Sequence, residues 1–419
     1  MKTRKSTLCA AAAAAIFAFA TEFAGATGYA LYETGARGNA MGGSLIGSTR
    51  DASAVYFNPA NMGETTNVCI MAGATFINPF HDLQIDGQPR RKMNAGWFTI
   101  PHAYITMPLP GGFSVGLGEY SEYGVGTKYK NNWRLANDSY ETTVMQVTTS
   151  PVLSYQVTDK WSVGAGARVS WLQFETYNRP YWTTSSALGM AANRAHVKGD
   201  DVSAGFILAT QYKLLDNLRA GVVYRSPIHH RLHGNFDLDM NSAFIPGAPY
   251  HLGTKCRGKV ELPQSIQLGL NWDITERWRA GASVTWTRWS ALDRLTIKVP
   301  THPALTHTTQ MNWHDVWRFG FGTEYDLLDW MCVRGSYQYD MDPSSELKGA
   351  TMMSAGHRSL IGSGLGFDLG GGWTLDVGYT LIIQDAVTRY IYDDMGAKHR
   401  FQTHNAFSHI VSASVGYSF

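Results

Sequence analysis

The end of the chain alternates between two kinds of residue at every second position. From Phe407 to Phe419 the odd positions are apolar or aromatic apart from His409, and the even positions are mostly serine. A β-strand places every second residue on the same face, whereas an α-helix repeats a face every three to four residues. The alternation therefore predicts a long β-strand with one apolar face and one small, polar face.

The same alternation recurs in 160–178, 277–299, 306–327 and 372–391, and each apolar face begins or ends in an aromatic residue. The opposite faces carry glycine, serine and threonine with single arginines. A soluble β-sandwich has strands of about 5–6 residues, but these runs last about 10–19 residues. Aromatic residues at both ends of an apolar band are typical of membrane barrels. We therefore expect the small, polar face to line a lumen.

Composition excludes the helical class of membrane protein. Charged residues make up 16% of the chain, against about 25% in soluble domains. Beyond the N-terminus no stretch reaches the roughly 18 consecutive apolar residues of a membrane helix. The fold predicted is all-β, a transmembrane antiparallel β-barrel of about 14 strands in the outer membrane of a Gram-negative bacterium. The strands expected are 67–80, 96–109, 112–126, 139–157, 160–178, 197–215, 217–235, 257–274, 277–299, 306–327, 330–342, 355–370, 372–391 and 401–419.

The first 26 residues have the features of a secretory signal peptide. A basic start at 2–5 precedes an alanine-rich apolar stretch, and 24–26 read Ala-Gly-Ala. This segment holds three of the 35 basic and one of the 33 acidic residues, so the rest of the chain carries 32 of each. Without a basic excess, nucleic acid is not expected as a partner. Cys69, Cys256 and Cys332 remain after cleavage, an odd number that allows one disulfide at most.

Residues 27–66 do not alternate. The segment is rich in glycine, alanine and asparagine, and it holds too many small and apolar residues for a solvated tail. A polar-lined barrel of this size holds either a water-filled channel or a plug. We therefore predict that 27–66 form a hatch inside a barrel of residues 67–419. Asn58, Pro59 and Ala60 are expected to form a turn of this hatch, because proline fixes φ and asparagine supports a side-chain turn.

Several short motifs follow one another along the mature chain. They are Gly38-Asn39-Ala40-Met41-Gly42-Gly43, Tyr56-Phe57-Asn58-Pro59-Ala60, Tyr123-Gly124, Tyr224-Arg225-Ser226-Pro227, Leu262-Pro263, Trp286-Thr287-Arg288-Trp289-Ser290 and the terminal Phe419. Each motif is weak alone. In this order and over this length, the chain resembles the FadL family of outer-membrane transporters for hydrophobic compounds, which includes TodX-like channels for aromatic hydrocarbons.

The resemblance implies passive transport of hydrophobic compounds, with no cofactor. Long-chain fatty acids are the expected cargo, and aromatic hydrocarbons are the alternative within the same family. The hatch would gate capture, and cargo would leave sideways into the bilayer through a kink at Tyr123 and Gly124 on the third strand. The resemblance also implies a monomer, contact with outer-membrane lipid, and recognition of Phe419 by the barrel-assembly machinery.

The third strand carries its own indication of a kink. Glycine is frequent within 113–126, and glycine inside a strand often marks a bulge or bend. Glu119 and Glu122 have opposite parity, so a regular strand would turn one of them towards lipid, which is costly. A kink near Tyr123-Gly124 would change the parity and relieve this conflict.

Cations in the lumen could hold the carboxylate of a cargo, because arginine binds carboxylates with two parallel hydrogen bonds. Alternation places Arg168 and Arg318 in the lumen, where salt bridges that brace the barrel are the simpler interpretation. In fatty-acid members of the family, cations near the ends of strands five and nine hold the headgroup. The matching positions here are uncharged, and Arg179 and Lys298 lie only nearby. Neutral aromatic cargo therefore stays open.

Other classes fit less well. An outer-membrane enzyme needs a nucleophile and an oriented histidine base, but no GxSxG motif occurs. His229, His230 and His233 form an HHxxH cluster, but alternation divides them between two faces, so no metal site is expected. A general porin has 16–18 strands and an open aqueous pore, without a long N-terminal plug. We expect a chain that is not an enzyme.

Overall fold

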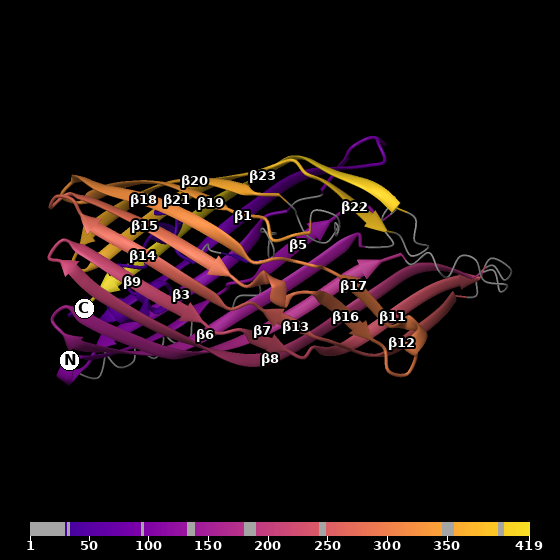
Figure 1. Ribbon diagram of the computed structural model, residues 1–419, viewed down its shortest axis with the longest axis horizontal. Helices are drawn as coiled ribbons and strands as arrows, with labels where there is room; N and C mark the ends of the chain where they lie inside the picture. The colour runs from indigo at the N-terminus through magenta and orange to yellow at the C-terminus, as the bar shows by residue number, and fades with distance from the viewer. Residues whose placement is uncertain are drawn as a thin grey trace.

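The computed structural model describes residues 30–31, 34–93, 96–131, 139–179, 190–242, 249–345, 356–392 and 398–419. Within these residues, antiparallel strands follow one another around a barrel (Figure 1), and the last strand pairs with the first. The fourteen positions of the wall are filled by β1 (Cys69–Ile85), β3 (Phe98–Pro108), β4 (Phe113–Tyr120) with β5 (Gly124–Lys128), β6 (Glu141–Thr158), β7 (Trp161–Asn178), β8 (Met190–Leu215), β9 (Leu218–Arg225), β14 (Ser265–Asp273), β15 (Trp278–Thr287), β18 (Val316–Leu328), β19 (Met331–Asp340), β20 (Arg358–Gly370), β21 (Trp373–Gln384) and β23 (Lys398–Ser418).

Closure of the wall satisfies the backbone groups that an open sheet edge would leave unpaired in lipid. The closing ladder between β1 and β23 runs from Cys69 opposite Ser418 to Ile85 opposite Phe401. The predicted all-β antiparallel barrel is therefore confirmed. The predicted signal peptide lies outside the described residues.

The outward face of the wall is apolar and the lumen face is small and polar. On β18, the outward side chains of Phe319 and Phe321 are 47% and 53% exposed. Arg318, which faces the lumen on the same strand, is 6% exposed. Large apolar side chains exposed in this way favour lipid over water, because burial of apolar surface is worth about 25 cal/mol per Å². Trp161, Trp278 and Trp373 are outward-facing aromatic residues at the end of the barrel with short turns. None of the described helices is long and apolar enough to cross a membrane.

Several wall strands are interrupted and then resume at the end of the barrel opposite the C-terminus (Figure 1). Pro227 and Pro263 stand at two of these interruptions, and proline cannot donate a ladder hydrogen bond. The resuming strands are β10 (Ile228–His230), β11 (His233–Ser242), β12 (Pro249–Gly258), β13 (Val260–Leu262), β16 (Arg294–Lys298), β17 (His307–Gln310) and β22 (Thr388–Tyr392), and β2 (Arg91–Lys92) pairs with β1.

These extensions correct two sequence expectations. The expected strands leave the intervals 179–196 and 236–256 outside the sheet, but β8 begins at Met190, and β11 and β12 form a hairpin that pairs with β8. Their outward residues are charged because they lie beyond the apolar band, so no apolar alternation marks them in the sequence. The backbone ladders hold this part of the sheet together with a buried apolar cluster that includes Val197, Phe236 and Cys256.

The N-terminal segment (residues 30–31 and 34–66) lies inside the barrel. It contains α2 (Ala36–Ala40), α3 (Ala54–Phe57) and the 3-10 helix η1 (Pro59–Glu64), which contact wall strands from β3 to β8 and from β19 to β23. Glycines on the lumen face permit this approach: a Cβ at Gly221 would lie 2.1 Å from the Ile46 carbonyl oxygen, and one at Gly322 would lie 2.2 Å from that of Met41. This position is consistent with the predicted hatch.

Candidate functional site

The wall is irregular between β4 and β5. Tyr120 of β4 lies opposite Thr148, and Gly124 of β5 lies opposite Met145, so three residues on this strand face two on β6. One extra residue reverses the inward and outward sides of a strand. Gln146 stabilises the irregularity, because its side-chain oxygen accepts hydrogen bonds from the backbone N–H groups of Glu122 at 2.8 Å and Tyr123 at 3.3 Å.

The inward and outward positions of this strand exchange only after Glu122. This corrects the expectation that the kink would remove both glutamates from the lipid-facing side. Even residues of β4 face inward, so Glu119 keeps the outward side and is half-buried in the wall, while Glu122 faces the lumen and is 6% exposed. The irregularity therefore does not remove Glu119 from the outward face. It instead turns Tyr123 and Val125 into the lumen, where both are buried.

The same irregularity leaves a gap in the hydrogen bonding of the wall. β3 pairs with β4 only as far as Ala103 opposite Glu119, and β5 pairs with β6. Among the described residues, no ladder joins β5 to the stretch of β3 from Phe98 to His102, which pairs only with β1. Pro101 lies within this stretch. Proline is tolerated there because the unpaired side of a strand requires no backbone N–H for a ladder hydrogen bond. Tyr123 and Gly124 therefore lie beside an unpaired section of the wall.

The N-terminal segment contacts this irregularity from inside. Ala30 forms an isolated antiparallel bridge with Tyr123, and the Leu31 N–H donates to the Glu122 carbonyl oxygen at 2.7 Å. The Tyr123 hydroxyl donates to the Pro263 carbonyl oxygen at 3.2 Å. Ala30 and Leu31 therefore contact, from the lumen side, the part of the wall that β3 leaves unpaired.

Three ionised groups gather next to this contact. The Glu122 carboxylate accepts a 2.6 Å hydrogen bond from Arg168 and lies 3.4 Å from Arg225. Arg168 also donates to the Ser226 carbonyl oxygen, and Arg225 donates to Gln267 and to the Tyr56 carbonyl oxygen. All three charged side chains are at most 6% exposed. Two cations and one anion leave this buried cluster with one excess positive charge.

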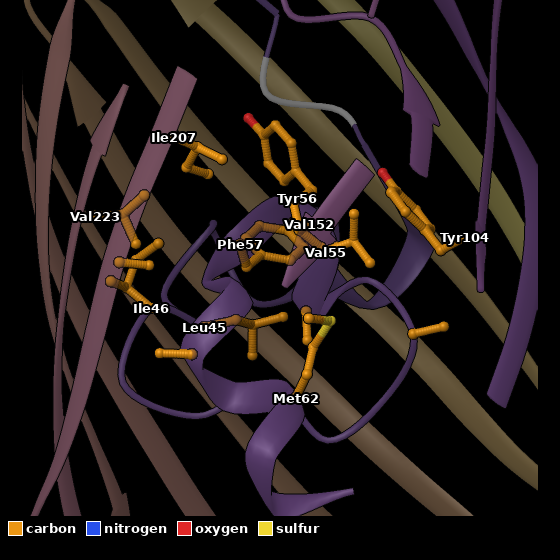
Figure 2. Packing of buried hydrophobic residues seen from close by; sticks show 14 of the residues in the cluster. Leu45, Ile46, Val55, Tyr56, Phe57, Met62, Tyr104, Val152, Ile207 and Val223 are labelled. Carbon is orange, nitrogen blue, oxygen red and sulfur yellow. The ribbon is translucent and has the colours of Figure 1, made fainter. Parts of the chain in front are cut away.

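A hydrophobic cluster anchors the N-terminal segment in the lumen. Figure 2 shows Leu45, Phe57 and Met62 of the segment between wall residues Val223 and Ile207 on one side and Tyr104 on the other. Leu45 and Met62 have no measurable exposure. Burial of side chains of this size stabilises a fold by about 1.5–3 kcal/mol each. The segment is therefore packed against the wall rather than loosely threaded.

The predicted turn residues lie within this cluster. Asn58 is fully buried, and its side-chain NH₂ donates to the carbonyl oxygens of Ile46 at 2.7 Å and Thr210 at 3.2 Å. Its side-chain oxygen accepts a 3.0 Å hydrogen bond from the Ala60 N–H, which caps η1 with Pro59 at the first position. Asn58 thereby joins two parts of the segment to β8. Ala60 lies so close to the wall that a Cβ at Gly164 would be 2.7 Å from its nitrogen.

Ion pairs also link the segment to the wall. Arg37 of α2 donates to Glu324 of β18 at 2.7 Å and to Asp51 at 2.8 Å. Glu324 is 3% exposed, and it also accepts hydrogen bonds from Arg279 at 2.8 Å and Arg334 at 3.0 Å. A buried carboxylate needs such partners, because an unpaired ion in the interior costs several kcal/mol.

An apolar chamber lies in the lumen beyond this segment, towards the end of the barrel opposite the C-terminus. It is formed by Ala30, Tyr123, Val125, Val144, Leu172, Phe174, Ile228, Leu232, Val260, Leu262, Trp289, Leu292, Leu295, Met311, Trp313 and Val316. Small cavities run along it. The outer one touches Leu232 and Cys256, the middle one touches Leu172 and Met311, and Phe174 lines both.

The inner cavity lies where the chamber meets the N-terminal segment. Ala30, Tyr123 and Tyr56 give it an apolar side, and Arg225 and Gln267 give it a polar floor. The Arg225 guanidinium lies 4.8 Å from the centre of the Tyr56 ring. The space for water centres is about 20 Å³, which is room for about one water molecule. A larger guest therefore requires side chains or the segment to move.

The four predicted headgroup cations are not brought together. Arg168 lies in the cluster with Glu122, and Arg318 lies elsewhere in the lumen, where it donates to Gln338 at 3.1 Å. Arg179 lies after the end of β7 and donates to the Asn131 carbonyl oxygen at 3.4 Å. Lys298 alternates with the inward Ile297 on β16 and is exposed on the outward face.

Sequence reasoning missed the role of Arg225. Its motif was noted as a strand end, and the structure adds that this residue forms the floor of the inner cavity. It also missed the pairing of Arg37 with Glu324, which are 287 positions apart. Spacing along the chain carries no signal for contacts of this kind.

The chain was compared with known proteins. A family model for outer membrane protein transport proteins (OMPP1/FadL/TodX) matches residues 17–419. An outer-membrane protein of Neisseria meningitidis serogroup B is 24% identical over 87% of this chain and 88% of its own length. The long-chain fatty acid transport protein of Escherichia coli O6:H1 is 24% identical over 78% of this chain and 80% of its own length.

Solved structures share the fold. A Pseudomonas aeruginosa FadL homologue superimposes with a TM-score of 0.83 at 20% identity, over 94% of this chain and all of its own. The toluene transporter TodX of P. putida gives a TM-score of 0.74 at 19% identity, over 92% of this chain and 98% of its own. The outer-membrane location predicted from the sequence is confirmed by the family match. With the fourteen-stranded barrel architecture and a family match over nearly its whole length, this chain belongs to the FadL/TodX family of outer-membrane transport proteins.

Proposed function

We propose that this protein transports hydrophobic compounds passively across the outer membrane, with long-chain fatty acids as the main cargo. The observation that carries the proposal is the apolar chamber that ends beside the unpaired section of wall between β3 and β5. An alkyl chain that enters the chamber from water gains about 0.8 kcal/mol for each buried CH₂ group. Nothing in such a path requires a chemical reaction.

Capture begins at the outer cavity, at Leu232 and Cys256, and continues along Phe174 into the middle cavity. The cavities are small, so the cargo advances as the N-terminal segment and the chamber residues rearrange. The position of this segment supports a hatch role, because the segment lies between the chamber and the end of the barrel with short turns.

Exit takes place sideways. Tyr123 and Val125 belong both to the chamber and to the strand that β3 leaves unpaired. A cargo that passes between β3 and β5 moves from one apolar environment to another. A cargo that instead crossed the N-terminal segment would meet the buried ion pairs around Glu324, where apolar atoms find no favourable contacts. The lateral route therefore has the lower barrier for a hydrophobic molecule.

A carboxylate headgroup would find a cation at the inner cavity. Arg225 forms its floor, Glu122 also lines the cavity, and these two groups together with Arg168 carry one excess positive charge. Arg168 already donates to Glu122 and to a carbonyl, which supports bracing for this residue. Arg225 has similar partners, but it lines the inner cavity and Arg168 does not, so Arg225 is the better candidate for headgroup binding in this chain.

Aromatic hydrocarbons are the alternative cargo, and one feature of the chamber favours them. The Trp289 ring contacts Trp313 edge-on at 5.2 Å and Tyr123 at 6.1 Å between centroids. Aromatic rings attract one another in this arrangement. TodX, which shares the fold, is named a toluene transporter.

Uptake measurements separate these cargoes. Cells that lack other outer-membrane transporters of this family would express the protein and receive radiolabelled oleate or toluene. We expect faster uptake of oleate than in cells without the protein, and a fall of at least tenfold in Arg225→Gln. Faster uptake of toluene alone would favour the alternative. Unchanged uptake of both compounds would refute the proposed function.

A further inference from the structure

A row of exposed polar residues that ends in two cations crosses the outward face of the sheet beyond the apolar band. The ladders place Asp200 of β8, His233 of β11, Arg257 of β12 and Lys298 of β16 directly opposite one another in turn. All four residues are exposed. β11, β12 and β16 lie at the end of the barrel opposite the C-terminus (Figure 1).

The register fixes where this row begins relative to the membrane. Trp171 of β7 lies opposite Val202 of β8, which is 63% exposed on the apolar band. Aromatic side chains of membrane barrels lie at the level of the lipid headgroups. Asp200 is the next outward residue of β8, about 7 Å further along the strand. Asp200 therefore lies in the headgroup layer of the outer leaflet, and the row continues from it across β11, β12 and β16.

The charges of this row are poorly matched within the protein. Arg257 and Lys298 are like charges directly opposite each other, an arrangement that destabilises a sheet. Among the described residues, neither has a carboxylate within 4.0 Å. Other outward cations on this sheet do have partners: Lys198 pairs with Glu175 at 3.3 Å, and Arg194 pairs with Asp239 at 3.0 Å.

More positive charge surrounds this pair. Arg231 and Lys259 are exposed next to the row, and Lys255 donates to the neutral side chain of Asn235 at 2.8 Å. Asp200 is the one carboxylate of the row itself, and His233 separates it from Arg257. Two like charges that face each other without a counter-ion are stabilised by an anion that bridges them.

We propose that Arg257 and Lys298 bind the phosphate groups of phosphorylated lipid in the outer leaflet of the outer membrane. Lipid is the partner that fits, because the row borders the apolar band and the acyl chains of the same lipid can cover Val202. Phosphate is the group that fits, because it offers several acceptor oxygens to two adjacent cations. Lys298 and Arg257 are both exposed on the outward face, and Arg257 also borders the outer cavity.

Lipid retention by the purified full-length protein tests this site. The protein would be titrated in detergent with diphosphorylated lipid A or with the dephosphorylated lipid, and bound lipid would be counted by native mass spectrometry. Each cation near an anionic lipid surface contributes about fivefold in affinity. The double variant Arg257→Gln with Lys298→Gln should therefore bind lipid A at least tenfold more weakly than wild type. The double variant Arg257→Lys with Lys298→Arg keeps both charges and should bind lipid A as wild type does.

Lys128→Gln with Arg194→Gln is the matched control, because it also removes two outward cations but these already have carboxylate partners. This control should retain lipid A, and heat-modifiable migration should be normal in every variant. The proposal is overturned if the Arg257/Lys298 glutamine variant binds lipid A as tightly as wild type. It is equally overturned if the control loses as much affinity, or if the dephosphorylated lipid binds wild type equally well.

Discussion

Replacement of Asn58 by alanine should open the barrel without unfolding it. The change removes three hydrogen bonds of a fully buried side chain, to Ile46, Thr210 and Ala60. A buried hydrogen bond contributes about 1 kcal/mol net, so the loss is about 3 kcal/mol. Because 1.4 kcal/mol is a factor of ten, the fraction of molecules with a displaced N-terminal segment should rise roughly 100-fold. The wall keeps its own ladders, so the barrel should still insert.

The assay is ionic current through single barrels in planar bilayers. Asn58→Ala should open more often than wild type, and Asn58→Asp should open more often still. Aspartate keeps the acceptor for the Ala60 N–H, but it turns a negative oxygen towards the carbonyl oxygens of Ile46 and Thr210. Asn217→Ala is the control, because this exposed side chain donates to one carbonyl in a turn. Current in Asn58→Ala no greater than in this control would refute the reasoning.

Other changes test the same segment and the wall. Arg37→Gln removes the ion pair with Glu324 and should destabilise the packed N-terminal segment by about 3 kcal/mol. This is at the low end for a buried pair, because Arg279 and Arg334 still pair with that carboxylate. Tryptic cleavage after Arg50 should become faster, and an unchanged cleavage rate would contradict this prediction. Gly221→Ala places a Cβ 2.1 Å from the Ile46 oxygen and should raise the ionic current, whereas Gly335→Ala, with open space around it, should not. Gly124→Val should block uptake of hydrophobic cargo while insertion stays normal, and uptake at the wild-type rate would mean that cargo leaves elsewhere.

The wall could be predicted from the sequence because lipid imposes one rule on every strand. Residues such as Phe319 and Phe321 must face lipid, so alternation reveals the strand and its face together. The rule ends where the lipid ends. The extensions β11 and β12 carry polar residues such as Asp237 and His251 on the outward face, and their sequence is therefore typical of a loop although the two strands pair along a ladder.

The site could be predicted only in part. Tyr123 and Gly124 were placed at an irregular strand by the resemblance to the FadL family, with support from the glycine content and the parity of nearby acids. The sequence could not show that β3 stops pairing at Ala103, because pairing is a relation between two strands. Nor could it show that Arg225 reaches Glu122 from a strand about 100 residues away.

The lateral path is tested most directly by where a cargo becomes covalently attached during transport. Cells that express the protein would take up a fatty acid with a photoreactive diazirine on its chain, and irradiation followed by mass spectrometry would locate the labelled residues. The account predicts labels on both sides of the unpaired wall, at Tyr123 and Val125 and at Phe98 or Ile100 of β3. Labels confined to Ser114 and Ser162, near the short turns and beyond the N-terminal segment, would show a cargo that crosses the lumen and would contradict lateral exit.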